Sequence, residues 1–346
     1  MKKHIALILT LALLLLSFAS CELFKKADSN DPDNNPDKEA ASTEPIKIAY
    51  MNGPTGMGIA KLIQDNGGTS GNEKYQFIKY DDAALATADL AAGNIDLACL
   101  PTNTAATLYN KTGKVSALAI NCLNSLHIMT KTGVQINSLA DLEGKTIYTI
   151  QNGTPAAILR HLLEESGVNA TVETSLGGKL IAAPTDLAPL LITGQIEIAL
   201  VPEPVATAAP LKIASQNKDY TYNVAITLTD VWSTISDSPV AMGCVVGNTN
   251  FVSANKDRIN AFLTEYEASI NYIADSANRD TAAQYIVDAG VLDAVPAAKK
   301  SLTNLGSAIA YIDGDEMKTV LGNFYTAIGA DLIGGKLPDE KFYYEK

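Results

Sequence analysis

The strongest constraint on this chain is a sixteen-residue phrase that occurs twice, with Gly, Ile, an acidic residue, Ala and Pro in register. The copies are LAAGNIDLACLPTNTA at residues 90–105 and LITGQIEIALVPEPVA at residues 191–206. A phrase repeated inside one chain indicates a duplicated structural unit, which limits the fold more than any single motif.

Each copy predicts the same local structure. Gly93 and Gly194 follow helix-like runs. The residue that ends a helix often adopts a left-handed backbone conformation, which glycine adopts most easily. The apolar segments 95–100 and 196–201 then suit strands buried on both faces of a parallel sheet. Pro101 and Pro202 stop these strands, and the polar or proline residues that follow are typical of a helix N-terminus.

Two such units, about a hundred residues apart, predict two similar α/β lobes, because a solenoid would repeat more often and at a period of roughly 20–50 residues. Chance resemblance between two ordinary strand-helix junctions is the alternative. A second recurrence makes chance resemblance less convincing. A glycine-rich loop at 52–58 follows a short apolar strand at 46–51. A loop of similar composition occurs at 151–155, before a well-patterned helix over 156–166. The duplication therefore extends beyond the opening phrase.

The remaining pattern alternates strands and helices and ends in a helical tail. Further strands are expected at 75–80, 115–122, 126–130, 147–150, 172–175 and 240–247. The tail contains four helical runs, at 258–274, 279–289, 296–309 and 315–328. Strand-helix alternation of this kind predicts an α/β fold.

The N-terminus has the pattern of a targeting segment, predicted to span residues 1–20. Lys2 and Lys3 precede an apolar run at 5–16, and small residues lead to Cys21. This resembles the lipobox of bacterial lipoproteins, which implies lipidation of Cys21 and a lasting membrane anchor. Phe18 departs from the aliphatic residue usual there, so an ordinary cleaved signal peptide is the alternative.

Residues 21–45 contain almost no apolar side chains and are expected to be a disordered tether. The folded body, expected to begin at Ile46, is long for one hydrophobic core and suits two lobes. The net charge of -12 argues against nucleic acid as a partner, because such binding needs basic patches. No metal-binding spacing is present, and of the cysteines in the body we would test Cys99 and Cys122 for a disulfide.

Several segments together resemble a known family. They are the glycine-rich first loop, LADLEGK at 139–145, GTPAAILR at 153–160 and GQIEIA at 194–199 leading to Glu203-Pro204. In this order they resemble the substrate-binding lipoproteins of ABC importers, in the group that binds nitrate, taurine, alkanesulfonates and thiamine precursors. The resemblance covers residues 46–328.

This resemblance implies a type II periplasmic-binding-protein fold, in which each of two lobes is a mixed, mainly parallel sheet flanked by helices. Residues 46–122 with 242–346 would form lobe 1, and residues 123–241 lobe 2. Two crossover strands would join the lobes, with hinge residues Asn121, Ser125, Pro239 and Gly243. The ligand would lie in a cleft between the lobes.

In such sheets, ligands bind beyond the carboxyl ends of the strands, which selects two loops from each lobe. The candidate ligand-binding residues are Asn52, Gly53, Pro54, Thr55, Gly56, Met57, Thr102, Asn103, Thr104, Asn152, Gly153, Thr154, Pro155 and Glu203. The lone Trp232 is added as an aromatic support for a ligand ring. Ordinary capping of helices is the alternative role of these loops.

The loop composition favours a neutral or weakly cationic heterocycle, or a zwitterion, over a dianion. No arginine lies in these loops, and Glu203 would repel a dianion but could accept a hydrogen bond from an amine. Glu203 could instead only brace its loop.

These features indicate a binding protein rather than an enzyme, with no cofactor. His127 and His161 are the only histidines after the targeting segment, and no triad or paired-carboxylate site is apparent. We expect an exported, membrane-anchored monomer that delivers a small molecule to an ABC permease and ATPase. The alternatives are a lipid-anchored sensor or adhesin with the same fold and, less favoured, an enzyme of pyrimidine-precursor metabolism.

Overall fold

The computed structural model describes residues 44–151 and 154–346, which contain two large β-sheets. The predicted targeting segment, the tether and Cys21 lie outside the described residues. The first sheet has six strands in the order β13-β4-β12-β3-β1-β2. Its strands are β1 (Ile46–Met51), β2 (Tyr75–Tyr80), β3 (Leu97–Pro101), β4 (Val115–Cys122), β12 (Gly243–Asn248) and β13 (Ile309–Ile312).

The second sheet has five strands in the order β11-β5-β10-β6-β7, and a separate two-stranded ribbon follows β7. The strands are β5 (Leu126–Lys131), β6 (Thr146–Tyr148), β7 (Thr171–Glu173), β10 (Ile198–Pro202) and β11 (Tyr222–Thr227), with β8 (Ser175–Leu176) and β9 (Lys179–Leu180) in the ribbon. We call the part of the chain around the six-stranded sheet lobe 1, and the part around the five-stranded sheet lobe 2.

Both sheets are mixed, with most strands of each running in the same direction and helices on their faces, which confirms the predicted fold class. In lobe 1, β12 and β13 run against the other four strands. In lobe 2, β5 alone runs against the other four. A chain that connects parallel strands must return over a face of the sheet, so helices cover both faces.

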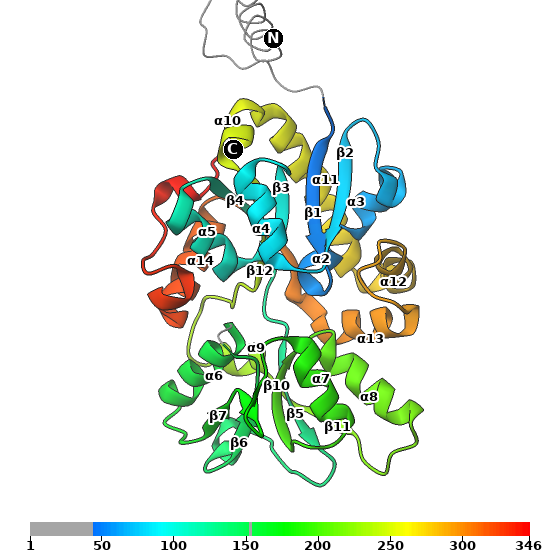
Figure 1. The fold of residues 1–346 in the computed structure, drawn as a ribbon, viewed down its shortest axis with the longest axis vertical. Helices are drawn as coiled ribbons and strands as arrows, with labels where there is room; N and C mark the ends of the chain where they lie inside the picture. Colours follow the sequence, from blue (N-terminus) through cyan, green and yellow to red (C-terminus); the bar gives the residue numbers. More distant parts are fainter. Residues whose placement is uncertain (1–43, 152–153) are drawn as a thin grey trace, which may run out of the picture. The chain divides into compact units, whose positions relative to one another are not determined.

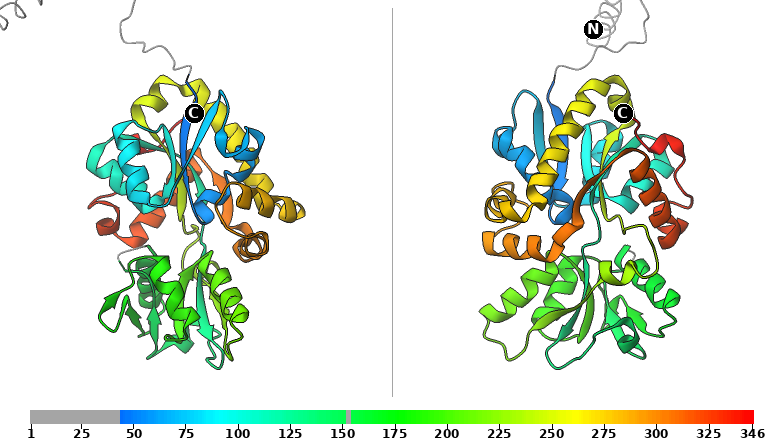
Figure 2. Two further views of the ribbon diagram at one scale, coloured as in Figure 1. Left: turned by 45° about the vertical axis from the view of Figure 1, so that its right-hand side comes forward. Right: turned by 180° about the vertical axis from the view of Figure 1, so that it is seen from behind.

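Helices sandwich the sheet of lobe 1 (Figures 1 and 2). One face carries α4 (Ala83–Ala92), α5 (Thr102–Thr112) and α14 (Gly314–Ile328), with the turn η5 (Ala330–Ile333). The other face carries α3 (Ala60–Asp65), α11 (Lys256–Ala274), α12 (Arg279–Asp288) and α13 (Val295–Leu305). Shorter elements are α2 (Pro54–Met57), α10 (Thr249–Ala254), η1 (Gly68–Ser70), η3 (Ser276–Asn278), η4 (Gly306–Ala308) and η6 (Glu340–Phe342).

Lobe 2 is covered in the same way. One face of its sheet packs against α6 (Thr154–Glu165), α9 (Leu228–Trp232) and the turn η2 (Leu139–Leu142). The other face packs against α7 (Pro184–Ile192) and α8 (Val205–Ser215). One hydrophobic core contains residues of both lobes, such as Leu100 of β3 and Ile128 of β5, whereas the other two cores each belong to one lobe.

The repeated phrase folds the same way in both lobes. Gly93 and Gly194 follow α4 and α7 with φ of 78° and 70°, the left-handed conformation that favours glycine. The strands begin two residues later than predicted, at Leu97 and Ile198, and each ends on the proline of the phrase. The helices α5 and α8 follow.

The strands β11 and β13 are not among the sequence predictions. β11 is an edge strand in which only Tyr222 and Ile226 of six residues are buried, so its composition lacks a strong apolar period. β13 lies where a helix was expected to continue to residue 309, but α13 ends at Leu305 and the chain turns through η4. It then joins β4 at the edge of the first sheet.

The chain passes between the two sheets twice. It leaves the first sheet after Cys122 and enters the second at Leu126, and it returns between Trp232 and Gly243. Ser125 and Pro239 lie in these connections. Asn121 lies instead inside β4, and Gly243 is the first residue of β12. Both therefore belong to the sheet of lobe 1 rather than to a free connection.

Candidate functional site

The carboxyl ends of neighbouring parallel strands bring the four predicted loops together in pairs. In lobe 1, β1 and β3 are parallel neighbours, so α2 and the start of α5 follow the same edge of the sheet. In lobe 2, β6 and β10 are parallel neighbours, so the loops before α6 and α8 also share an edge. Loops at this edge are where open α/β sheets bind ligands.

The two edges approach each other at Gly53 and Pro204. A Cβ atom added to Gly53 would lie 3.9 Å from the Cδ atom of Pro204. Gly53 has φ of 89°, so a side chain there would also be strained. The first loop of lobe 1 and the Glu203-Pro204 loop of lobe 2 therefore face the same interlobe region.

Within the first loop, only Asn52 and Thr55 have polar side chains available to a ligand. Asn52 is exposed and Thr55 half-buried, whereas Met57 is fully buried in the core of lobe 1. Gly56 packs so closely that a Cβ atom would lie 1.8 Å from the carbonyl oxygen of Met51. Pro54 is buried at the start of α2 and shapes the loop.

In the second loop of lobe 1, the structure separates Thr102 from its neighbours. The Thr102 hydroxyl donates to the carbonyl of Ala241 at 2.6 Å, and its amide donates to the carbonyl of Met242 at 3.1 Å. Thr102 thus holds the second crossover and is 1% exposed. Asn103 and Thr104 are half-buried, and the structure gives their side chains no hydrogen bond among the described residues. They remain the better candidates for ligand contact.

The first loop of lobe 2 is only partly described. Asn152 and Gly153 lie outside the described residues. Thr154 and Pro155 begin α6 and are both buried, with Thr154 6% exposed. The Thr154 hydroxyl lies at the N-terminus of a twelve-residue helix, where the first backbone N–H groups lack partners within the helix.

Glu203, predicted either to bind the ligand or to brace its loop, is held by protein groups. Its side chain is fully buried and accepts hydrogen bonds from Asn304 Nδ2 at 2.7 Å, Ser301 Oγ at 3.1 Å and Thr207 Oγ1 at 3.1 Å. Ser301 and Asn304 lie on α13 of lobe 1, while Glu203 and Thr207 belong to lobe 2. We call these four residues the interlobe carboxylate cluster, and their bonds favour the bracing role.

Burial is the largest influence on the pKa of Glu203 and of the neighbouring His127. It raises the pKa of Glu203, and the hydrogen bonds from Asn304, Thr207 and Ser301 oppose that rise. His127, whose Nε2 lies 3.8 Å from Glu203 Oε1, has its pKa lowered by burial to about 4. The imidazole is therefore neutral at pH 7, and its contact with Glu203 is not an ion pair.

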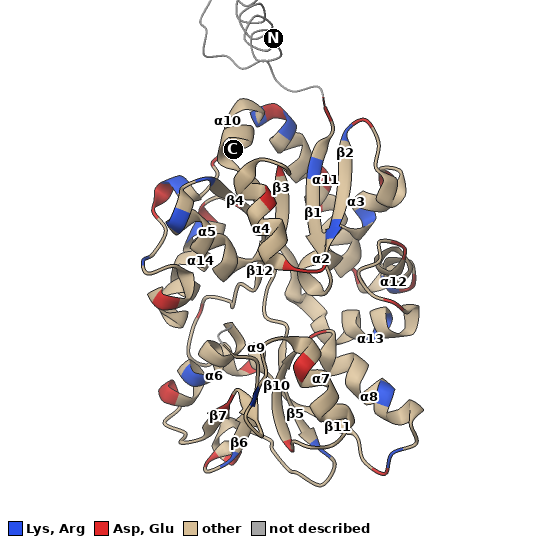
Figure 3. Cartoon of the chain, in the orientation of Figure 1, with Lys and Arg blue, Asp and Glu red and all other residues tan. Residues whose placement is uncertain are grey.

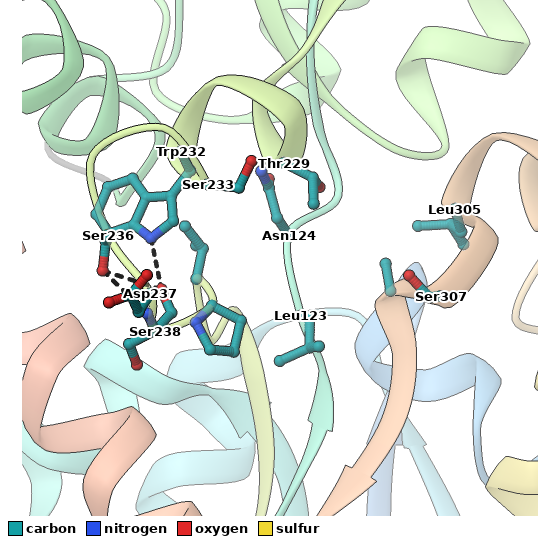
Figure 4. Close-up of a pocket in the computed structure, with 13 residues that line it drawn as sticks. Leu123, Asn124, Thr229, Trp232, Ser233, Ser236, Asp237, Ser238, Leu305 and Ser307 are labelled. Atoms are coloured by element: carbon teal, nitrogen blue, oxygen red, sulfur yellow. Dashed lines mark hydrogen bonds between the residues drawn. The ribbon is translucent and has the colours of Figure 1, made fainter.

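Trp232 lies apart from the four loops. It ends α9, is 4% exposed, and donates from Nε1 to the carbonyl of Ser238 at 2.7 Å. Its ring packs against His161 of lobe 2 and Phe324 of lobe 1. It lines a cavity of about 180 Å³ beside the two crossovers, and none of the cavity's lining residues comes from the four loops (Figure 4).

Positive charge is scarce around the loops. Figure 3 shows α2 without charged residues and most Lys and Arg on the outer helices and strand ends. Arg258 donates to the carbonyl of Glu44, and Arg279 donates to the Thr303 hydroxyl, so both lie elsewhere in lobe 1. Arg160 is exposed on α6.

Cys99, Cys122 and Cys244 are free and buried. The pair proposed for testing, Cys99 and Cys122, is thus not disulfide-bonded in this structure. Burial raises the pKa of Cys99 to about 11 and that of Cys122 to about 12. Both are thiols at neutral pH and behave as small apolar residues.

The described residues contain no cluster of three or more His, Cys, Asp or Glu side chains placed to hold a metal ion. Over the same residues, no helix combines the length and the apolar character needed to cross a bilayer.

Comparison with known proteins identifies the family. Residues 74–279 match the family model described as NMT1/THI5 like. This chain belongs to that family. No curated protein matches its sequence.

Solved structures share the fold of this NMT1/THI5-like chain. An ABC transporter protein from Parabacteroides distasonis is 22% identical, with a TM-score of 0.70 over 88% of this chain and 100% of that one. The periplasmic aliphatic sulphonate-binding protein SsuA from Escherichia coli is 14% identical, with a TM-score of 0.67 over 88% and 93%. The periplasmic nitrate-binding protein NrtA from Synechocystis is 16% identical, with a TM-score of 0.55 over 80% and 75%.

These neighbours establish the fold as that of the solute-binding proteins of ABC importers. Those described by function are binding components rather than enzymes. This agrees with the expectation of a binding protein.

Proposed function

We propose that this protein is the extracytoplasmic solute-binding component of an ABC importer, which captures a small molecule between its lobes and delivers it to a permease and ATPase. The observation that carries this proposal is the meeting of two sets of strand ends at one interlobe region, with Gly53 and Pro204 in proximity. Family membership and the fold of the neighbours support it.

The proposed ligand contacts are the side chains that the protein leaves available. Asn52, Thr55, Asn103 and Thr104 come from lobe 1, and Thr154, at the start of α6, comes from lobe 2. The sequence adds Asn152 and Gly153, which lie outside the described residues. These groups are uncharged, and amide and hydroxyl side chains can donate and accept. We therefore keep a neutral or weakly cationic heterocycle or a zwitterion as the proposed ligand class. Sulfonate and nitrate, named for two neighbours, are the competing class.

The lobe boundaries are part of the same proposal. Lobe 1 would comprise residues 46–122 and 242–346, and lobe 2 residues 123–241, with Ser125 and Pro239 as the hinge positions that lie between the sheets. Closure by hinge motion needs only a few residues at element ends to change their backbone angles. In that motion, Ser301 and Asn304 of lobe 1 would move relative to Glu203 and Thr207 of lobe 2.

Membrane attachment rests on the sequence alone. A signal peptide over 1–20, lipidation of Cys21 and a tether over 21–45 would keep a monomeric binding protein beside its permease. Several acyl chains, at about 0.8 kcal/mol per buried methylene, give lasting attachment. Mass spectrometry of the N-terminal peptide from membranes tests this, because an unmodified peptide starting after a different cleavage site would rule out the anchor.

A thermal-shift screen tests the binding function. A ligand present at a hundred times its dissociation constant stabilises the folded protein by about 2.7 kcal/mol. We expect amines, pyrimidines or amino acids to raise the melting temperature, and Asn103→Ala to weaken that response. Hits confined to sulfonates would overturn the ligand class, and catalytic turnover of a hit would overturn the binding role.

A further inference from the structure

Three hydrogen bonds of the interlobe carboxylate cluster connect α13 of lobe 1 directly to lobe 2. Asn304 Nδ2 donates to Glu203 Oε1 at 2.7 Å and to Thr207 Oγ1 at 2.9 Å. Ser301 Oγ donates to Glu203 Oε2 at 3.1 Å. Figure 1 shows α13 above α8, and the two helices are in contact. The lobes are therefore held together by side chains as well as by the two crossovers.

The cluster is buried where the surfaces of the two lobes meet. The Glu203 side chain is 0% exposed, and Ser301 and Thr207 are 0% and 3% exposed. Ser301 lies on the buried stripe of α13, whose other buried members are Ala298, Leu302 and Leu305. A buried hydroxyl needs a hydrogen-bond partner, and Glu203 provides it. The polar member of this stripe thus has its partner in the other lobe.

Glu203 also contacts the first crossover and lies beside the proposed ligand loops. Its amide donates to the carbonyl of Ser125 at 2.9 Å, and Ser125 is one of the proposed hinge positions. The next residue, Pro204, faces Gly53 of lobe 1. The residue that binds α13 is therefore bonded to a hinge position and adjacent in the chain to the interlobe region.

The burial of Glu203 depends on the arrangement seen here, with α13 against α8, which we call closed. Two of its three side-chain donors, Ser301 and Asn304, belong to lobe 1, and Thr207 belongs to lobe 2. A buried carboxylate that loses a donor is strongly unfavourable. When the lobes separate, water hydrates both the carboxylate and the freed donors. Loss of one donor therefore disfavours the closed arrangement and has little effect on an open one.

We propose that the interlobe carboxylate cluster is a latch, which sets how often the lobes separate, and that Glu203 acts in lobe closure rather than in ligand contact. This proposal rests on the hinge motion of the proposed function. A ligand that touches both lobes favours closure through its higher affinity for the closed arrangement. Here protein side chains supply part of that stabilisation, so the lobes close around a ligand at a smaller cost in affinity.

A thiol placed at the latch measures lobe opening. Thr207→Cys puts this thiol on α8 under α13, in a chain that also carries Cys21→Ser and is purified without a membrane. Iodoacetamide reacts with the thiol when α13 moves away. If the lobes close again faster than the thiol reacts, the labelling rate is proportional to the open fraction. Peptide mass spectrometry assigns each labelled position.

The native thiols Cys99, Cys122 and Cys244 provide an internal control. All three are free and buried on strands of lobe 1. They become labelled when lobe 1 unfolds rather than when the lobes separate. Their labelling rates therefore distinguish lobe opening from unfolding in the same sample.

Removal of one donor tests the latch. In the Thr207→Cys chain, Asn304→Ala removes the shortest bond to the buried carboxylate. We expect the labelling rate at position 207 to rise about ten- to a hundredfold, the value of a hydrogen bond to a charged group. Ser301→Ala should act in the same direction. Glu203→Gln keeps an acceptor for Asn304 and can donate to the Ser301 hydroxyl, so its rate should rise less than about threefold.

Thr303→Ala is the matched control on the same helix. The Thr303 hydroxyl accepts from Arg279 Nη1 at 2.9 Å and donates to the carbonyl of Lys299 at 2.8 Å. This variant therefore removes two hydrogen bonds next to Asn304, and both lie inside lobe 1. Its labelling rate at position 207 should equal that of the chain with Thr207→Cys alone.

The outcomes separate the latch from the hinge motion. Faster labelling at position 207 in Asn304→Ala, with unchanged labelling of the three native thiols, supports the latch. Equal rates in Asn304→Ala and Thr303→Ala would overturn the latch and leave the hinge motion in place. Labelling of position 207 only together with the native thiols would overturn both. Ligand capture is tested separately, because none of these rates requires a ligand.

Discussion

At the residue scale, the structure divides the predicted site residues by what already occupies their polar groups. Thr102 and Glu203 are bonded to the second crossover and to α13, whereas Asn103 and Thr104 have no such bonds among the described residues. The sequence places all four just after a strand but contains no signal for the partners. Those partners lie 98 to 139 positions away in the sequence, and only the folded chain brings them near.

Removal of the Glu203 carboxylate tests the bracing role. Glu203→Ala leaves Asn304 Nδ2 and the Ser301 hydroxyl buried without an acceptor, so we expect a loss of about 2–3 kcal/mol in the free energy of unfolding. Urea denaturation measures this loss. Glu164→Ala changes an exposed glutamate on α6 and should cost less than about 0.5 kcal/mol. Equal stability of the two variants would contradict the bracing role.

The acid dependence of stability tests the buried state of His127. Its pKa falls from 6.5 in the unfolded chain to about 4 in the folded protein, so the unfolded state binds the proton more tightly. The contribution of neutral His127 to the free energy of unfolding is complete above pH 6.5. It is lost as the pH falls toward 4, by about 3 kcal/mol in total. The raised pKa of Glu203 acts with opposite sign, since protonation of that group favours the folded state.

The variant His127→Gln separates these effects. The free energy of unfolding of this variant should no longer show the decline between pH 6.5 and 4 that His127 causes. The pH dependence due to Glu203 should remain. Chemical denaturation at several pH values gives both curves. Parallel curves for the variant and the unaltered protein would show that His127 is not buried as a neutral group.

At the element scale, the repeated phrase explains how much of the fold the sequence predicts. Its glycine, apolar run and proline act locally, and the corresponding helix ends, strands and helix starts were correctly located to within two residues. The edge strands β11 and β13 depend instead on pairing with β5 and β4. Such pairing outweighs weak local propensity, so these strands could not be found from composition.

Gly93 and Gly194, the glycines of the repeated phrase, allow backbone strain to be compared with steric clash against neighbouring side chains. Gly93→Ala meets no atom within 4 Å, so only its left-handed backbone is strained, at about 1 kcal/mol. In Gly194→Ala the new Cβ atom would also lie 2.9 Å from Cζ of Tyr220 and 3.0 Å from Nζ of Lys131. We expect the second variant to lose more stability in thermal denaturation. A neutral Gly93→Ala would contradict the conformational argument.

At the scale of the whole molecule, the two lobes are joined by more than the crossovers. The α13–α8 contact contains the interlobe carboxylate cluster, and α14 contacts α6 beside the Trp232 and Phe324 rings. Lobe opening must break or shift these contacts. Sequence patterns predict two lobes but not which surfaces hold them together, because no local period encodes a contact between α13 and α8.

Ligand capture between the lobes is tested most directly by native mass spectrometry of the protein purified without denaturation from its own cells. We predict a complex of one protein with one small molecule, lost after unfolding and refolding, restored by adding that molecule and weakened in Asn103→Ala. A protein that carries no small molecule, and that binds none from extracts of those cells, would contradict the proposed function.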